Sequence, residues 1–344
     1  MYNNYRFILE KGSKKHYCPY CNKKRFVRYV DLDTGEYLPE QYGKCDRLIN
    51  CGADNNPYLD GYVKSIYLQE QGSNYTFQPK AIKYTKKVID NKRYFIPVEV
   101  LKETLSGYSK NVFVQNLLKN VKFPFEKTAI EKVISLYNLG TIQNGYRSGA
   151  ISFPFIDIDN NIRAIQVKQF DKTNHTTGTD FVHSIIEKEH TKSLKPLPDW
   201  LNNYLKNESK VTCLFGEHLL TKYKYNAVAL VEAPKTAVYC NLYFGFPDNP
   251  NNLLWLAVYN LSSLNFEKCK ALQGRKVFLF PDLSKDGKAF ELWNNKAKKL
   301  QEQMKETIFK VSDYLEQFAT PEDKEQGKDI ADFLIQNDWR LFRK

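Results

Sequence analysis

Ala227-Val-Ala-Leu-Val-Glu232 and Val277-Phe-Leu-Phe-Pro-Asp282 are the two stretches that decide the fold of the last third of this chain. Each is a short apolar run that ends in an acidic residue and leads into a predicted helix. Two further strands are predicted at Leu253–Val258 and Thr307–Val311. The two helices are predicted to begin at Lys235 and to span Phe290–Lys305. Because strands that alternate with helices form parallel sheets, this pattern predicts an α/β fold with a mostly parallel sheet.

The acidic residues at the two strand ends predict a metal site. In open parallel sheets ligands bind outside the carboxyl ends of the strands, so Glu232 and Asp282 are expected to converge on one cation. Mg²⁺ or Mn²⁺ suits them, because such ions are held by one or two carboxylates together with substrate phosphates. Asp286, four residues after Asp282, is a third candidate ligand if it reaches around the turn, and the alternative is that it caps the helix that begins near Lys288. Lys235 and Lys288 stand near predicted helix starts, where phosphate groups bind.

The middle of the chain predicts a separate α+β region. Apolar periodicity indicates helical pieces between Val98 and Leu139, and alternation predicts a hairpin of Ile151–Ile156 and Ile162–Val167. A polar loop is expected at Lys172–Asp180, and a proline-containing linker at Leu194–Trp200 leads into a short helix. These changes in composition and apolar periodicity predict three domains, with residues 1–60, 61–205 and 206–344.

Four of the seven cysteines fall in two pairs near the start of the chain, at Cys18, Cys21, Cys45 and Cys51. Four thiolates close a tetrahedral structural zinc site, and the Cys-x-x-Cys turn places two sulfurs on one knuckle. The pattern therefore predicts a zinc ribbon over residues 1–60, with a hairpin in the 23-residue insert and His16 as a possible substitute ligand. The remaining three cysteines lie in apolar stretches and are expected in the core.

The charge balance of the 344-residue chain, 51 − 39 = +12, favours a polyanionic partner. A dense share of the cations lies on the predicted ribbon, interleaved with aromatic rings, which suits phosphate contact and base stacking. The candidate nucleic-acid-binding residues of the ribbon are Lys23, Lys24, Arg25, Arg28, Tyr29 and Arg47. Further cations lie at Lys80–Lys87. The alternative interpretation is a solvated face beside a structural zinc.

Composition excludes several classes of protein. Hydrophobic residues make up 42% of the chain, which is too many for a disordered protein, and no apolar run approaches the ~18–20 residues of a membrane span. The start, Met1–Gly12, lacks the pattern of a signal peptide, and the odd cysteine count argues against a secreted disulfide scaffold. We therefore expect a cytoplasmic protein without a membrane partner. The histidines are scattered and form no pattern for nucleophilic catalysis.

Two motifs resemble the Toprim domain of primases, topoisomerases and related nucleases. The first is Val231-Glu232-Ala-Pro-Lys235-Thr236-Ala237, and the second is Phe280-Pro-Asp282-Leu-Ser284-Lys-Asp286-Gly287-Lys288-Ala289. The hairpin from Gly149 to Arg163 is similar to the segment before Toprim in bacterial replicative primases, which also begin with a zinc ribbon. The stretch Gly327-Lys328-Asp329-Ile-Ala-Asp332-Phe-Leu334 resembles the segment after Toprim in phage-type primases. The stretch Cys213-Leu-Phe-Gly-Glu-His218-Leu-Leu, together with Cys45-Asp-Arg47, looks closest to Toprim proteins of Bacteroidetes mobile elements.

This resemblance implies a Toprim-type sheet, a primase-core-like region before it, and nucleotidyl transfer for primer synthesis on a single-stranded DNA template. Glu232 would match the Toprim acid of proton transfer or metal binding, and Asp282 the first residue of its Asp-x-Asp motif. The second position of that motif is Ser284, which puts catalysis in question. Nucleotides and, by analogy, a helicase are the implied partners. Two alternatives stay open, namely a nucleic-acid-binding module that has lost turnover and a Toprim nuclease.

Overall fold

The computed structural model describes residues 5–46, 51–73, 77, 93–207 and 209–343. Contacts within the chain divide it into two compact units, one of residues 1–93 with 205–208 and one of residues 94–204 with 209–344. Each unit is described by itself. The predicted three-part division at residues 60 and 205 stays a prediction.

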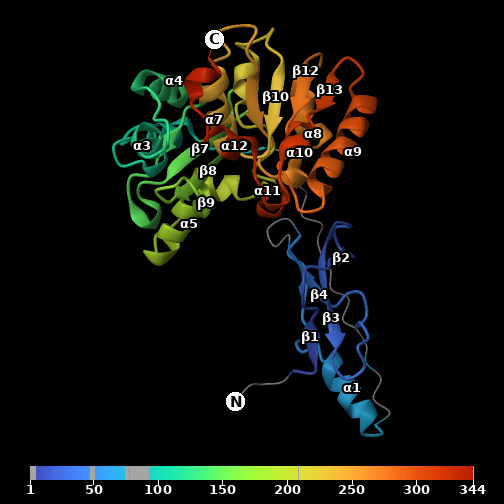
Figure 1. Ribbon diagram of the computed structural model, residues 1–344. Helices are drawn as coiled ribbons and strands as arrows, with labels where there is room; N and C mark the ends of the chain where they lie inside the picture. Colours follow the sequence, from blue (N-terminus) through green and yellow to red (C-terminus); the bar gives the residue numbers. More distant parts are fainter. Residues whose placement is uncertain (1–4, 47–50, 74–76, 78–92, 208, 344) are drawn as a thin grey trace. The chain divides into compact units, whose positions relative to one another are not determined.

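The first unit is a small antiparallel sheet followed by one helix (Figure 1). Its strands run in the order β1-β3-β4-β5, and β2 pairs with β3. The bounds are β1 Phe7–Leu9, β2 His16–Tyr17, β3 Lys24–Asp31, β4 Gly43–Cys45, β5 Asp54–Asn55 and α1 Tyr62–Glu70. A core of five buried side chains, Phe7, Tyr29, Leu38, Tyr42 and Val63, lies against this sheet.

The predicted hairpin of the ribbon is only partly formed. Its first arm lies in β3, but the return arm makes a single bridge, between Val30 and Tyr37, and β4 is the strand that pairs alongside. Gly43 permits this pairing, because a Cβ at that position would lie 2.3 Å from the carbonyl oxygen of Val27. A glycine thus fixes which segment becomes the neighbour of β3.

The second unit begins with helices and an antiparallel sheet of order β6-β7-β8-β9. The elements are α2 Val98–Lys102, α3 Val112–Lys119, α4 Lys127–Tyr137, β6 Gly140–Thr141, η1 Gly145–Arg147, β7 Ile151–Ile156, β8 Ile162–Phe170, β9 Thr176–Phe181, α5 Val182–Lys192 and α6 Asp199–Tyr204. The predicted hairpin is present as β7 and β8. The predicted loop at Lys172–Asp180 instead contains most of β9, because its threonine-rich sequence pairs with β8 from Gln166 onward.

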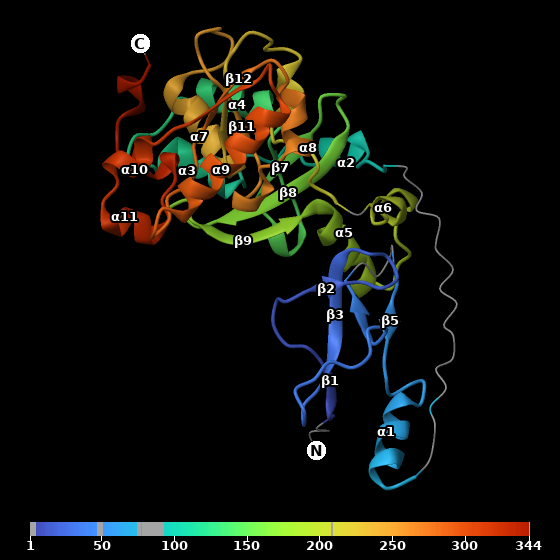
Figure 2. The ribbon, with the colours of Figure 1, turned by 90° about the vertical axis from the view of Figure 1, so that its right-hand side faces the viewer.

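The rest of the second unit is a parallel sheet of order β11-β10-β12-β13. Its elements are η2 Glu217–Leu220, β10 Val228–Val231, α7 Pro234–Phe244, β11 Leu254–Ala257, η3 Leu261–Ser263, α8 Phe266–Cys269, η4 Lys270–Leu272, β12 Lys276–Leu279, α9 Lys288–Gln303, β13 Ile308–Val311, α10 Tyr314–Phe318, α11 Pro321–Gln326, α12 Ile330–Leu334 and η5 Trp339–Leu341. The predicted mixed α/β fold with a parallel sheet is confirmed. Helix α7 packs on β10 and β11, and α9 packs on β13 (Figure 1). Figure 2 shows α7 beside β11.

One hydrophobic core joins the antiparallel and parallel sheets of the second unit. The ring of Tyr137 at the end of α4 stacks on Phe215 with centroids 4.7 Å apart, and its hydroxyl donates to the carbonyl oxygen of Trp255 in β11 at 2.5 Å. Asn241 of α7 donates to the same hydroxyl at 2.6 Å. The two sheets are therefore held at a fixed position relative to each other. No helix among the described residues is long and apolar enough to cross a membrane.

Candidate functional site

The four paired cysteines come together in the first unit as the sequence predicts. Their sulfur atoms all lie within 4.8 Å of one another, with 3.7 Å between Cys18 and Cys51 and 3.9 Å between Cys21 and Cys45. These spacings are too long for disulfides and match the edge of about 3.8 Å expected when four sulfurs surround zinc at ~2.3 Å. The arrangement fits a closed, structural zinc site.

The knuckle that carries the first pair is built by local hydrogen bonds. The backbone N–H of Asn22 donates to the carbonyl oxygen of Cys18, and the N–H of Cys18 donates to that of Lys23, both at 2.8 Å. Asn22 adopts a positive φ of 53°, which asparagine tolerates better than most residues. His16 is not part of the thiol cluster within the described residues, since its Nε2 lies 2.7 Å from Oε2 of Glu10.

The predicted nucleic-acid contacts on the ribbon occupy different environments. Lys23, Lys24 and Arg25 are exposed at the start of β3. Arg28 lies over the ring of Tyr37 at 4.7 Å and donates to the carbonyl oxygen of Leu38 at 2.6 Å. Tyr29 is a core residue with 9% of its surface exposed, which leaves its ring without a free face for a base. Arg47 lies outside the described residues.

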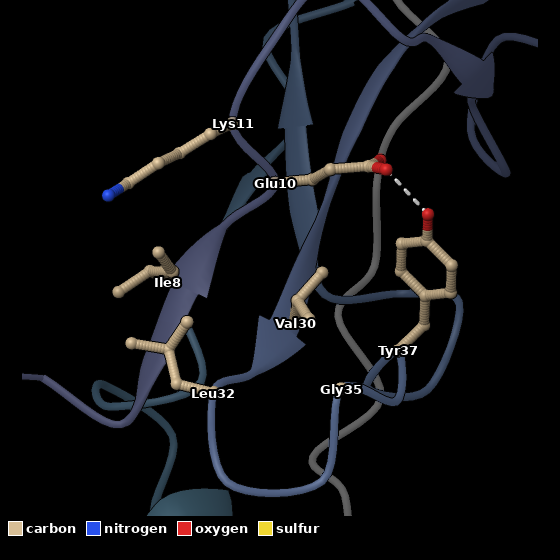
Figure 3. Close-up of a pocket in the computed structure, with 7 residues that line it drawn as sticks. All are labelled: Ile8, Glu10, Lys11, Val30, Leu32, Gly35 and Tyr37. Carbon is tan, nitrogen blue, oxygen red and sulfur yellow. Dashed lines mark hydrogen bonds between the residues drawn. The ribbon is translucent and has the colours of Figure 1, made fainter.

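The first unit also carries a pocket, lined by Ile8, Glu10, Lys11, Val30, Leu32, Gly35 and Tyr37 (Figure 3). Its floor is apolar, and the Glu10 carboxylate is turned toward the Tyr37 hydroxyl, which donates to it at 2.6 Å. Among the described residues that line this space, no set of polar side chains points into it to orient a ligand. We therefore assign no site to it.

The predicted strand-end acids of the second unit lie at the same edge of the parallel sheet. Strands β10 and β12 are neighbours, with Leu230 opposite Leu279, and Glu232 and Asp282 follow within three residues of their ends. The backbone N–H of Asp282 donates to the Glu232 carboxylate. Both side chains are largely buried, and the pairing of β10 with β12 brings these two carboxylates together.

Asp329 and Asp332 join this group, although we did not predict a site role for them. They form a capping box at the start of α12, in which each side chain accepts from the other's backbone N–H. Thr236 Oγ1 donates to Asp329 Oδ2 at 2.6 Å, and Lys235 Nζ lies 3.8 Å from a carboxylate oxygen of each aspartate. The Asp-x-x-Asp spacing by itself indicates a helix cap, and the resemblance of this stretch to the segment after Toprim in phage-type primases is the signal that could have found the two residues. We call Glu232, Asp282, Asp329 and Asp332 the acidic cluster.

Ionising three members of the acidic cluster, Glu232, Asp282 and Asp332, is unfavourable. Burial, with the charge of Asp329, raises the pKa of Glu232 to about 7, although the hydrogen bond from Asp282 opposes the shift. Burial and the charges of Asp329 and Glu232 raise the pKa of Asp282 well above its usual range, and burial likewise raises that of Asp332. Burial opposes the charge of Lys235, but Asp329 and Asp332 outweigh it and raise the pKa of Lys235. These carboxyl groups would ionise more readily beside an additional cation.

The carboxylates of the acidic cluster are more widely spaced than the thiols. Among the described residues, the four cysteines form the only set of three or more metal-ligating groups whose ligand atoms all lie within 4.8 Å. A cation at the acidic cluster would therefore take one or two carboxylates directly and complete its shell with water or phosphate oxygens, a mode typical of Mg²⁺.

The other residues predicted near this site are placed apart from it. Asp286 is half-exposed and forms an ion pair with the exposed Lys288, which holds the pKa of that carboxyl below its usual range. Ser284 Oγ accepts from the backbone N–H of Ala289 at 2.9 Å and so caps the first turn of α9. Of the predicted site residues in this unit, Glu232, Asp282 and Lys235 are brought together.

Two family models match the chain. One, described as a domain of unknown function (DUF6371), matches residues 111–283 and thus half of the sequence. The chain belongs to the DUF6371 family. The other model, a zinc beta-ribbon finger, matches residues 5–65. With the four-thiol cluster, this match supports structural zinc in the ribbon of this DUF6371 protein.

Two solved structures resemble the chain. The primase fragment of the bacteriophage T7 primase-helicase protein is 10% identical with a TM-score of 0.34, over 87% of this chain and 89% of that one. The zinc-binding and RNA polymerase domains of the Aquifex aeolicus primase are 14% identical with a TM-score of 0.35, over 97% of this chain and 78% of that one. No curated protein matches the sequence.

Proposed function

We propose that this DUF6371 protein is a Toprim-type, primase-like protein that binds single-stranded nucleic acid and performs metal-dependent nucleotidyl transfer. One observation carries the proposal, namely the convergence of Glu232 and Asp282 from neighbouring parallel strands with Asp329 from α12. Burial raises the pKa values of Glu232 and Asp282, and carboxylates of this kind at the carboxyl end of a parallel sheet favour a functional site.

The donor set fits Mg²⁺ or Mn²⁺. All candidate ligands are hard carboxylate oxygens, and burial, with the charge of Asp329, raises the pKa of Glu232, a shift that a bound divalent cation would offset. Such an ion neutralises phosphate charge and aligns the attacking hydroxyl in nucleotidyl transfer. Glu232 and Asp282 would hold the ion, and Lys235 would balance the remaining charge. A role for Asp286 as a third ligand requires that its ion pair with Lys288 opens.

The ribbon would supply nucleic-acid binding. Lys23, Lys24 and Arg25 project from the start of β3 next to the thiol cluster, where zinc would fix the knuckle that carries them. Exposed cations of this kind bind the phosphate backbone with little sequence preference. Nucleotides are the proposed substrates, replication of a mobile element is the proposed setting, and a helicase partner is an expectation by analogy alone.

A second candidate function is a nucleic-acid-binding module without turnover. Ser284 supports it, because this residue stands at the position of the second Toprim aspartate and its hydroxyl caps the first turn of α9. Such a protein would keep the ribbon and the sheet but bind metal weakly.

Primer synthesis on single-stranded DNA, with Mg²⁺ or Mn²⁺ and labelled nucleotides, tests the proposal. We expect product from the wild-type protein, none from Glu232→Gln, and normal product from Glu302→Gln, a matched control at the exposed end of α9. Salt-sensitive DNA binding without product from any variant would favour the second candidate. Shortening of the labelled template in a parallel reaction would indicate a nuclease.

A further inference from the structure

Lys168 brings a cation to the acidic cluster from a different sheet. It lies in β8 of the antiparallel sheet, where it is opposite Ile151 of β7 and Thr179 of β9. Its ammonium nevertheless interacts with the charges of Lys235, Asp329 and Asp282, which belong to α7, α12 and the end of β12. No sequence pattern singled out this lysine.

The packing around β8 explains why Lys168 lies there. Phe170, two residues along the strand, packs on Phe113 with centroids 5.0 Å apart, and Phe113 contacts Tyr239 of α7 at 5.9 Å. Tyr239 is one helical turn after Lys235, so the same contacts that join Phe170 to Tyr239 bring Lys168 toward Lys235.

Hydrogen bonds also hold β8 and α7 together. Asn174, in the turn after β8, donates to the Tyr239 hydroxyl at 2.7 Å, and Asn116 of α3 donates to Asn174 Oδ1 at 2.6 Å. Asn174 and Asn116 are both buried, with 6% and 2% of their surfaces exposed. Buried, fully paired amides of this kind hold a rigid geometry, so the position of Lys168 is set by the fold.

The ammonium of Lys168 has no hydrogen bond or ion pair within the part of the chain that the structure describes. It is largely buried, and burial together with the charge of Lys235 lowers its pKa. Keeping an unpaired cation in such a place is costly. Lysines that are held this way beside carboxylates are suited to bind an anion that arrives together with a metal ion.

We propose that Lys168 binds a phosphate group at the acidic cluster. A lysine acts as a compact point charge toward phosphate, which the carboxylates themselves would repel without a cation. The phosphate belongs either to a nucleoside triphosphate or to the backbone of a bound strand, and both present the same chemistry. This inference rests on the proposed function, because it takes the acidic cluster to be the place where phosphate and metal meet.

The experiment compares Lys168→Gln with Lys172→Gln, which removes the same charge from an exposed lysine four residues along the chain. Binding of a fluorescent ATP analogue and of a labelled single-stranded oligonucleotide is measured in Mg²⁺, and binding of Mn²⁺ alone is measured by electron paramagnetic resonance. Lys168→Arg serves as the conservative variant, and circular dichroism melting checks that each protein is folded.

We expect Lys168→Gln to lower the affinity for the nucleotide or for the oligonucleotide by about tenfold or more, which is the loss typical of removing a charge-assisted hydrogen bond. The affected ligand identifies the source of the phosphate. Mn²⁺ should bind as tightly as in the wild type or more tightly, because a repelling charge has gone. Lys172→Gln should leave every affinity unchanged, and Lys168→Arg should restore part of the loss.

Equal affinities of wild type and Lys168→Gln for both ligands would overturn the proposal, as would a wild-type protein that binds neither ligand. Loss of Mn²⁺ binding in Lys168→Gln would also overturn it, because a phosphate-binding residue is not needed for metal alone. If the wild type binds no Mn²⁺ yet Lys168→Gln still weakens phosphate binding, the inference stands and the proposed metal function fails.

Discussion

The hydroxyl of Thr236 donates a 2.6 Å hydrogen bond to Oδ2 of Asp329, which joins the first turn of α7 to the first turn of α12 across 93 positions of sequence. Both residues are buried, with 0% and 6% of their surfaces exposed. Because Asp329 Oδ1 already accepts from the N–H of Asp332, the aspartate is fixed at both oxygens. This contact places the C-terminal helix against the strand-end acids.

Thr236→Val should therefore destabilise the protein. Valine keeps the shape of threonine but leaves a buried carboxylate oxygen without its donor, which costs about 1–3 kcal/mol. Urea denaturation of the variant checks the expected loss. Thr191→Val removes an exposed hydrogen bond from the Thr191 hydroxyl to the carbonyl oxygen of Glu187 on α5, and it should lower the free energy of unfolding much less. Equal effects of the two substitutions would show that the Thr236–Asp329 contact contributes little to stability.

Ser284 allows the cap and the metal site to be tested separately. Ser284→Ala should lower stability by about 1 kcal/mol, because the N–H of Ala289 loses its acceptor. Ser284→Asp keeps an acceptor and adds a carboxylate near Asp282, so Mn²⁺ affinity should rise by about tenfold. Ser284→Asn is the uncharged control. No gain from Ser284→Asp would mean that position 284 does not face the ion.

The features that can be predicted from the sequence are those that depend on contacts between residues close together in the chain. The strands that carry Glu232 and Asp282 are short apolar runs with local turn signals, and the four cysteines have a spacing that zinc imposes, so both were predicted. Asp329 was missed as a site residue, although its stretch resembles the segment after Toprim, because its contact with Thr236 lies 93 positions away in the sequence. Lys168 was missed because its environment depends on contacts between Phe170, Phe113 and Tyr239, which no local pattern contains.

The β9 strand shows the same limit. Residues from Lys172 to Asp180 are polar and form a loop by composition, but half of them pair with β8 because that strand has a free edge. Tyr29 is the reverse case. Its position among basic residues suggested an exposed ring, whereas β3 turns it toward the small core of the first unit.

Glu217 should make stability depend on pH. Its carboxylate is buried and accepts from the backbone N–H groups of Leu214 and Ile158 at 2.9 and 3.2 Å. Burial raises its pKa to about 7, so the folded protein retains a proton that the unfolded chain loses above pH 4.5. Stability from this group is thus full below pH 4.5 and is lost as pH rises to about 7, with a slope of up to ~1.4 kcal/mol per pH unit.

The measurement compares the slope of unfolding free energy against pH, from 5 to 7, in wild type and Glu217→Gln. Burial lowers the pKa values of His183 and His218 to about 4, so these histidines give a slope of opposite sign between pH 4 and 6.5. They are present in both proteins, and their contribution cancels in the difference. Glu302→Gln, an exposed control, should show the wild-type slope. Identical slopes in all three proteins would place the pKa of Glu217 near its ordinary value.

Zinc should be required for the first unit but not for the second. We expect about one zinc per chain on metal analysis, with little in Cys18→Ser or Cys45→Ser, because three thiolates leave the tetrahedral site open. His16→Ala should keep its zinc, since His16 contacts Glu10 rather than the thiol cluster. A strong chelator should expose amides of β3 and β4 to hydrogen exchange and leave β10 and β12 protected, because the second unit has its own core. Zinc-free wild-type protein with a protected ribbon would contradict the assignment, and loss of zinc from His16→Ala would make that histidine a ligand.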